Sequence, residues 1–252
     1  MFNNKAMTSL DTELMSRFDQ TADSYNAKHC LSHVGAFFNE LEVHVVKEWA
    51  LGGGGSCGLD IPCGTGRLTI CLANCCEVVI AGDISINMLK IAQEEASRTE
   101  ITNVTFQQVS GRRLPFSENT FDTIICFGFI HLIPNDQKGE FMSEFNRVLK
   151  PGGKLILEMR SLFYGLFLVL LKYRRRLTEI PRECFLPGQG RWLFRTYRKG
   201  RAVGIGFPFF WMLARIFGKN VMMKISLTLG RIPVLRFLAY AIVFELYNEK
   251  QK

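Results

Sequence analysis

Apolar residues recur along the chain in two alternating patterns, which together predict an α/β protein. In residues 8–50 they return every three or four positions, as at Ala36, Phe37, Leu41 and Val45, and this spacing predicts helix. After the glycine run at 52–55, short apolar runs alternate with helical stretches, the pattern of a parallel sheet with crossover helices. The predicted strands are Cys57–Ile61, Val78–Gly82, Val104–Val109, Thr123–Phe127 and Lys154–Met159. The predicted helices between them are Gly66–Leu72, Ser85–Arg98 and Asp136–Leu149.

Polar and glycine residues mark several ends of these elements. Ser85 is a good N-cap for the second helix, whose inner face would carry Met88, Leu89, Ile91 and Ala92. Residues 151–153, Pro-Gly-Gly, are expected to end the third helix.

Beyond Met159 the periodic pattern weakens. Ser161–Leu171 is an apolar helix candidate that runs into Lys172, Arg174, Arg175 and Arg176, and the prolines and glycines of residues 181–190 indicate loop. Two late strands, Ala202–Phe207 and Ala241–Tyr247, are predicted to flank an apolar helical stretch over Phe209–Leu229.

The charge of the chain is distributed unevenly. The net charge of +8 is the balance of −5 in residues 1–160 and +13 in residues 161–252. A basic third interleaved with aromatic residues suits an anionic partner: a membrane surface, a phosphorylated substrate or a nucleic acid. A solvated basic face that aids solubility is the alternative.

Composition indicates a folded protein of the reducing cytoplasm. The hydrophobic fraction is 48%, the longest apolar run covers only ten residues at 162–171, and a bilayer span needs about 18 to 20. The first twenty residues lack the basic start and apolar stretch of a secretory signal. The eight cysteines contain no CxxC pair, so buried reduced thiols are expected rather than disulfides or a metal site. His29 and His33 are one helical turn apart, but no acidic third ligand is near in sequence, and no metal is predicted.

Candidate chemistry begins in the segment 59–68, LDIPCGTGRL, which follows the first strand and opens a helix. Gly64 and Gly66 allow a sharp turn and a close approach of the backbone to a ligand. The helix start then offers unpaired N–H groups. A second acid, Asp83, ends the next strand 23 residues after Asp60, near the spacing at which a carboxylate binds a ribose diol. The segment is neither GxGxxG nor a P-loop, because Leu68 and Thr69 follow Gly66.

Four segments in this order and spacing carry a family resemblance: LDIPCGTGRLT, VIAGDIS, RLPFSENTFDTIICF and RVLKPGGKLILEM. Over about residues 15–160 the chain resembles class I S-adenosylmethionine-dependent methyltransferases, and more narrowly their small-molecule and lipid branch, which includes the ubiquinone-type enzymes. The resemblance implies a Rossmann-like fold with a mostly parallel seven-stranded sheet in the order 3-2-1-4-5-7-6 and helices on both faces.

The resemblance also implies a set of cofactor contacts. Asp60 and the backbone of Pro62, Cys63, Gly64, Thr65 and Gly66 would hold the methionine end of S-adenosylmethionine. Asp83 would accept both ribose hydroxyls, and Ile84 would cover adenine. The remaining implied contacts are Ser110 and Gly111 at the adenine edge, Cys126 and Phe127 near the methyl group, and Tyr25 in a covering N-terminal segment. The chain departs from many relatives at Ser110, where they carry an acid, and at Pro62, where a glycine is common.

Methyl transfer is an in-line displacement on an activated donor, so alignment and desolvation can supply much of the catalysis. A base is needed only for an acceptor that must lose a proton. His131, after the fourth strand, is the candidate catalytic residue, with a structural loop histidine as the alternative. Tyr25 either lines the pocket or packs between helices, and Arg67 either faces the substrate or caps a strand end.

Three segments of one structural domain are expected: a helical lid over residues 1–50, a cofactor-binding core over 51–160, and a C-terminal completion of the sheet over 161–252. The last carries Phe209, Trp211, Phe217, Arg215 and Lys219, which would lie in a membrane interface, roof an apolar acceptor pocket, or pack as ordinary helices.

Three functions remain open. The first is methylation of a small or lipid-like acceptor in the cytoplasm, with a peripheral place on the inner face of a membrane. The second is RNA methylation through Arg174–Arg176, Arg191, Arg195, Arg198 and Lys199, although no RNA-binding module is recognisable. The third is a cofactor-binding scaffold without activity. The sequence does not fix the oligomeric state.

Overall fold

The computed structural model describes residues 7–29, 32–51, 57–161, 184–185 and 188–249. Its centre is a seven-stranded sheet in the order β3-β2-β1-β4-β5-β7-β6, which confirms the predicted topology. The strands are β1 (Cys57–Asp60), β2 (Val78–Asp83), β3 (Val104–Gln108), β4 (Phe121–Cys126), β5 (Leu149–Arg160), β6 (Tyr197–Ile205) and β7 (Ala241–Asn248). Strands β1 to β5 pair in parallel, and β7 runs antiparallel to both β5 and β6.

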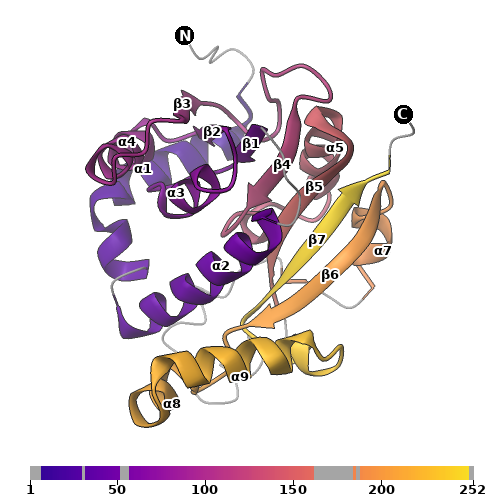
Figure 1. The fold of residues 1–252 in the computed structure, drawn as a ribbon. Helices are drawn as coiled ribbons and strands as arrows, with labels where there is room; N and C mark the ends of the chain where they lie inside the picture. Colours follow the sequence, from indigo (N-terminus) through magenta and orange to yellow (C-terminus); the bar gives the residue numbers. More distant parts are fainter. Residues whose placement is uncertain (1–6, 30–31, 52–56, 162–183, 186–187, 250–252) are drawn as a thin grey trace.

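Helices cover both faces of this sheet (Figure 1). They are α1 (Ser9–His29), α2 (His33–Leu51), α3 (Arg67–Ala73), α4 (Ile86–Arg98), α5 (Lys138–Val148), α7 (Gly190–Leu193), α8 (Phe210–Phe217) and α9 (Lys219–Arg231), with 3-10 turns η2 (Ile130–Leu132) and η4 (Leu235–Leu238). One apolar cluster joins the sheet to α5, α7 and part of α1, and another joins it to α2, α3 and α9.

Several strand and helix bounds differ from the sequence predictions. The helical region predicted over 8–50 consists of two helices, α1 and α2. The predicted helical stretch over Phe209–Leu229 is also two helices, because Gly218 has φ +85° between them, a conformation that ends a helix.

The region around residue 150 also departs from the prediction. Helix α5 already ends at Val148, and the Pro-Gly-Gly of residues 151–153 lies within β5 rather than in a connecting turn. Strand β6 starts at Tyr197, five residues before the predicted start, with an irregularity between Lys199 and Ala202. The predicted helix Ser161–Leu171 lies outside the described residues except for Ser161, which forms a bridge with Phe185.

The parallel order brings the carboxyl ends of β1, β2, β4 and β5 to one edge of the sheet. The order reverses at β1, since β2 lies on one side of it and β4 on the other. Crevices for ligands form at such reversal points in open α/β sheets. Helix α1 packs against α4 beside this edge (Figure 1).

Candidate functional site

The turn after β1 is built around two glycines in left-handed conformations. Gly64 has φ +53° and Gly66 has φ +84°, values that side chains other than glycine rarely adopt. A Cβ on Gly66 would lie 2.9 Å from the Cβ of Ala92 on α4, so the turn packs directly against that helix. The turn therefore places the start of α3 close to α4.

Two carboxylates end β1 and β2 beside this turn. Asp60 is buried, and its Oδ2 accepts a 2.6 Å hydrogen bond from Thr69 Oγ1. Asp83 is also buried; its Oδ2 accepts from the Gly64 N–H and its Oδ1 from the Ser85 N–H, each at 2.9 Å. Both acids keep lone pairs that a ligand can use.

Burial raises the pKa of both acids. The pKa of Asp60 rises to about 7, mainly because burial disfavours its charged form, although the Thr69 hydrogen bond and the Arg67 charge oppose the rise. The pKa of Asp83 rises to about 6 for the same reason, against the hydrogen bonds from Ser85 and Gly64. Two buried acids with raised pKa values in a cleft are typical of a functional site.

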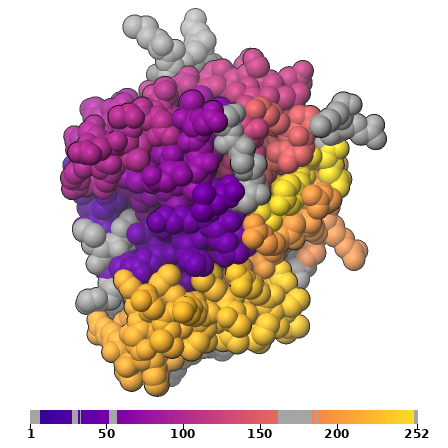
Figure 2. Space-filling model, viewed as in Figure 1, coloured from indigo at the N-terminus to yellow at the C-terminus, as the bar shows by residue number. Residues whose placement is uncertain are grey.

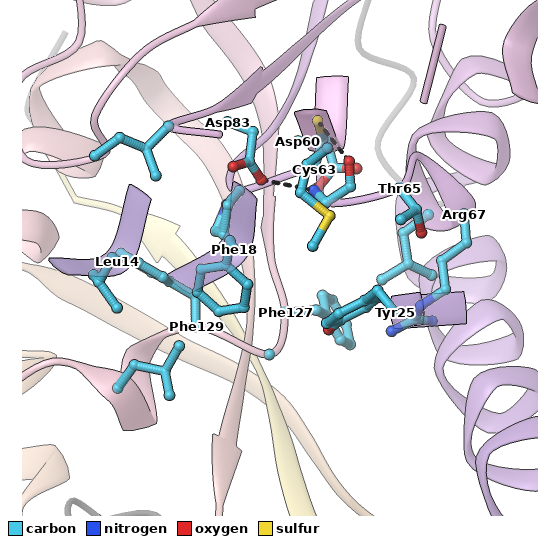
Figure 3. A pocket seen from close by; sticks show the side chains of 17 residues that line it. Leu14, Phe18, Tyr25, Asp60, Cys63, Thr65, Arg67, Asp83, Phe127 and Phe129 are labelled. Atoms are coloured by element: carbon cyan, nitrogen blue, oxygen red, sulfur yellow. Dashed lines mark hydrogen bonds between the residues drawn. The ribbon is translucent and has the colours of Figure 1, made fainter. Parts of the chain in front are cut away.

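An open pocket, whose empty space together with adjoining open solvent is about 710 Å³, lies over the turn and the two acids. Figure 3 shows Asp83 and Asp60 at one side of it, with Phe127 and Tyr25 across from them. Nine of the residues expected to bind cofactor line this pocket: Tyr25, Asp60, Pro62, Cys63, Gly64, Thr65, Asp83, Ile84 and Phe127.

The other four residues expected to bind cofactor, Gly66, Ser110, Gly111 and Cys126, are not among the residues that line this pocket. Gly66 forms the turn, and Cys126 is fully buried at the end of β4. Gly111 packs against Phe141. Ser110 Oγ donates to Asp11 Oδ1 on α1 at 3.3 Å, so a buried acid does lie beside Ser110, but it comes from α1.

Sequence reasoning missed several lining residues from three helices and from the segment after β4: Leu14 and Phe18 of α1, Leu68 of α3, Met88 of α4, and Gly128, Phe129 and Leu132 after β4. For the α1 residues, the sequence does contain a pattern that could have identified them. Leu14, Phe18 and Tyr25 are four and seven residues apart, which places them on one face of a helix. That apolar face covers the pocket.

Helix α1 is joined by hydrogen bonds to the loops that form the pocket. Asp19 Oδ1 accepts from Ser85 Oγ at 2.5 Å and from the Asn87 N–H at 3.2 Å. Asn26 Oδ1 accepts from Thr65 Oγ1 at 2.6 Å. Ser85 also caps α4 through the Met88 N–H, as predicted. The cover over the pocket and its floor are therefore directly connected.

His131 lies in η2, between the lining residues Phe129 and Leu132, but does not itself line the pocket. Its Nδ1 is buried and has no hydrogen-bond partner among the described residues. Burial lowers its pKa well below the ordinary value, and the charges of Arg160, Lys138 and Arg17 lower it further. The imidazole is therefore neutral at pH 7.

Arg67 has a structural role as well as a place in the lining. Its guanidinium donates to Asn39 Oδ1 at 2.7 Å and pairs with Glu42, both on α2. These bonds connect the pocket to α2.

No cluster of three potential metal ligands occurs within the described residues. Helix α1 ends at His29 and α2 begins at His33, but the side chains of this pair lie outside the described set. No two of the seven cysteines that the structure describes are joined by a disulfide. Burial raises the pKa of Cys63 and Cys126 well above its ordinary value, so both stay protonated.

Asp60 is expected to make stability depend on pH. Its pKa is about 7 in the folded protein against 3.8 ordinarily, so between these values the folded state binds more protons than the unfolded chain. The free energy of unfolding therefore falls as the pH rises through that window. Asp60→Asn should remove about 3 kcal/mol of this fall between about pH 5 and 7.5, as measured by urea unfolding.

The control for this experiment is Asp122→Asn, which changes a carboxylate near the opposite end of β4 that pairs with Lys150. It should keep the wild-type fall in stability over the same pH range. Equal falls in Asp60→Asn and wild type would contradict the prediction.

Comparison with known proteins finds similarity to methyltransferases over part of the chain. The family described as "Methyltransferase domain" matches residues 59–153. The chain is 39% identical over 103 residues to a demethylmenaquinone methyltransferase of Lactiplantibacillus plantarum, covering 39% of this chain and 42% of that protein. It is 38% identical over 107 residues to a ubiquinone/menaquinone biosynthesis C-methyltransferase of Marinomonas sp., covering 40% and 41%. The matched part thus spans about two fifths of these relatives.

Solved structures extend the similarity of fold to most of the chain. The magnesium protoporphyrin IX methyltransferase of Synechocystis, with bound SAH, superposes with a TM-score of 0.67 at 16% identity, over 94% of this chain and 99% of that one. The same enzyme with bound SAM gives a TM-score of 0.63. The predicted fold class is confirmed.

Proposed function

We propose that this chain is a class I S-adenosylmethionine-dependent methyltransferase and that it transfers a methyl group from S-adenosylmethionine to a small-molecule acceptor of the quinone type. The observation that carries the proposal is the pair of buried acids, Asp60 and Asp83, on either side of the glycine turn at the switch point of the sheet. The quinone type is suggested by the names of the relatives.

The pocket residues fit the donor. In this proposal Asp83 accepts hydrogen bonds from the ribose hydroxyls, and Ile84, Met88 and Leu14 offer apolar surface for adenine. The other end would be held by Asp60 and by the turn at Gly64, whose missing side chain leaves open space there. When bound, the donor supplies a methyl carbon already activated by a sulfonium.

The protein's own contribution would then be alignment, exclusion of water and removal of a proton. Phe127, Phe129 and Tyr25 would shield the reacting centre from water. His131, whose buried Nδ1 has no hydrogen-bond partner on the described part of the chain, would take the acceptor's proton. Residues 1–50 would act as a lid through α1, and 51–160 as the donor-binding core.

The function is tested with methyl-labelled S-adenosylmethionine. The protein is incubated anaerobically with 1,4-naphthalenediol, with a total lipid extract and, separately, with total RNA. Label in the naphthalenediol or lipid product supports the proposal. Label in RNA with none in the other two overturns it in favour of an RNA methyltransferase. Donor binding without transfer to any of them supports an inactive scaffold.

We further propose that the protein attaches to an anionic membrane surface through α8, α9 and η4. No residue of α8 is buried. Large apolar side chains are exposed over residues 209–238, among them Phe209, Ile216, Phe217, Val221 and Val234. Figure 2 shows these helices forming one end of the molecule. No helix in the described part of the chain is long and apolar enough to cross a membrane.

Charge supports the same surface. Residues 209–238 contain five cations and no acid. Lys219 and Arg231 pair with α2, through Glu40 and Glu48, whereas Arg215 and Lys224 form no ion pair with any residue that the structure describes. Cations beside exposed apolar side chains suit lipid headgroups above acyl chains.

Neutralising both Arg215 and Lys224 with glutamine should weaken binding to vesicles of phosphatidylcholine and phosphatidylglycerol. Each cation near such a surface contributes about 1 kcal/mol, so the partition coefficient should fall more than tenfold. Cosedimentation measures it. The control is Lys90→Gln, an exposed lysine on α4, which should bind as wild type. An undiminished partition in the double variant would refute the membrane proposal.

A further inference from the structure

A group of buried charged side chains lies past the carboxyl ends of β4 and β5. Glu158 is fully buried, and its Oε2 accepts a 2.6 Å hydrogen bond from the N–H of Gly128, a pocket-lining residue. The Nε of Arg160 lies 3.3 Å from Glu158 Oε1. The guanidinium of Arg160 stacks on the Tyr240 ring, 4.0 Å from its centroid.

Arg160 has many more donors than partners. A guanidinium carries five N–H donors, yet that of Arg160 makes no hydrogen bond to any residue in the described ranges. Its Nε, the Glu158 Oε1 and the His131 Nδ1 are all buried atoms without hydrogen-bond partners there. A buried polar group left without a hydrogen bond costs about 1–3 kcal/mol, so such a cluster indicates a missing partner.

The cluster adjoins the proposed acceptor side of the pocket. Arg160 interacts electrostatically with Tyr25, which lines the pocket from α1, and with His131, which is flanked by lining residues. Gly128, held by Glu158, lies in the pocket wall itself. The Arg160 guanidinium, which makes no hydrogen bond to a described residue, is therefore joined through Glu158 to the part of the pocket wall where the proposed function requires an acceptor.

We infer that Arg160 binds the ionised oxygen of a phenol- or enol-type acceptor, with His131 as the base that receives the oxygen's proton. The inference rests on the proposed function and names the acceptor's chemical class. Arginine suits this task because it stays charged and offers several donors to one oxygen.

The reaction balances for methylation of the ring carbon next to that oxygen. The O–H proton passes to His131, and the ring carbon forms its bond to the methyl carbon while the bond from that carbon to the donor's sulfur breaks. The ring C–H proton then moves to the oxygen, so one proton is released in total. Arg160 stabilises the negative charge on the oxygen before the transfer.

The test compares two probes of the same ring, 1,4-naphthalenediol and 1,4-dimethoxynaphthalene, of which only the first can ionise. Binding to protein saturated with S-adenosylhomocysteine is measured anaerobically by calorimetry. Arg160→Met should weaken binding of the diol at least tenfold and change binding of the dimethoxy probe less than twofold. The absorbance of the ionised diol should also appear at a pH about one unit higher than in wild type.

Two further variants guard against a structural explanation. Arg201→Met removes another arginine, an exposed one that pairs with Glu245 and lies over the Trp49 ring, and should leave both probes unaffected. Arg160→Met combined with Glu158→Gln leaves no unpaired charge and keeps an acceptor for the Gly128 N–H. It should reproduce the selective loss even where Arg160→Met alone fails to fold.

Equal losses for both probes, or no loss for either, would overturn the inference and leave Arg160 as a counter-ion of Glu158. Binding of S-adenosylhomocysteine to the wild type separates the two levels of the argument. If the wild type does not bind it, the proposed function itself fails. If the wild type binds it but not the diol, only the assignment of the acceptor fails.

Discussion

Replacing Asp83 by alanine is expected to weaken the binding of S-adenosylmethionine at least tenfold. The carboxylate is buried in the pocket, and in the proposed complex it accepts hydrogen bonds from the ribose hydroxyls. Hydrogen bonds to a charged group contribute about 1.5–3 kcal/mol, which corresponds to a tenfold to hundredfold change in affinity. Calorimetric titration of the purified protein measures the dissociation constant.

Asp83 also accepts hydrogen bonds from Gly64 and Ser85, so a structural effect must be separated from a loss of ligand contact. Asp83→Asn keeps one acceptor oxygen for Gly64 and removes the charge, and it should still lose most of the affinity. Asp122→Ala, at the other end of the sheet, should bind as wild type. An unchanged dissociation constant in both Asp83 variants would show that this acid does not bind the donor.

Substituting alanine for Gly66 is expected to lower the free energy of unfolding by about 2–4 kcal/mol. The left-handed conformation, with φ +84°, costs about 1–2 kcal/mol for a residue with a Cβ. The new Cβ would also lie 2.9 Å from the Cβ and 3.1 Å from the Cα of Ala92, and a backbone atom cannot move aside cheaply. Urea unfolding monitored by circular dichroism gives the change.

Gly128→Ala is the matched control. Gly128 also has a positive φ, +65°, but no atom of the described residues lies within 4 Å of where its Cβ would be. It should therefore lose only the conformational part, about 1–2 kcal/mol. If both variants lost the same stability, contact between the turn and α4 would not explain the requirement for glycine at position 66.

The sheet was predictable from the sequence because its strands are local apolar runs bounded by glycine and polar residues. Val78–Asp83 and Phe121–Cys126 differ from their predicted bounds by at most two residues at either end. The ends of elements that depend on backbone conformation were less predictable. Gly218 divides α8 from α9 through its positive φ, which no periodicity reveals.

The pocket residues that directly follow a strand could be predicted from the sequence. Those contributed by segments distant in the sequence could not. Asp60, Gly64 and Asp83 lie directly after β1 and β2, and the motif order therefore locates them. Arg160 and Glu158 could not be recognised from the sequence, because the relevant feature is visible only in the structure. Arg160 Nε and Glu158 Oε1 are buried atoms without hydrogen-bond partners among the described residues. Asp11, which meets Ser110 from 99 residues away, is a second example.

The hydrogen bonds from α1 to the two ligand-binding loops have a kinetic consequence. Asp19 and Asn26 join the helix to Ser85 and Thr65, so under the proposed function the helix could move away from a bound donor only after these bonds break. An acceptor that entered from the β4 and β5 side would not need that step. Turnover should therefore follow a compulsory order, in which the nucleoside enters first and its demethylated product departs last.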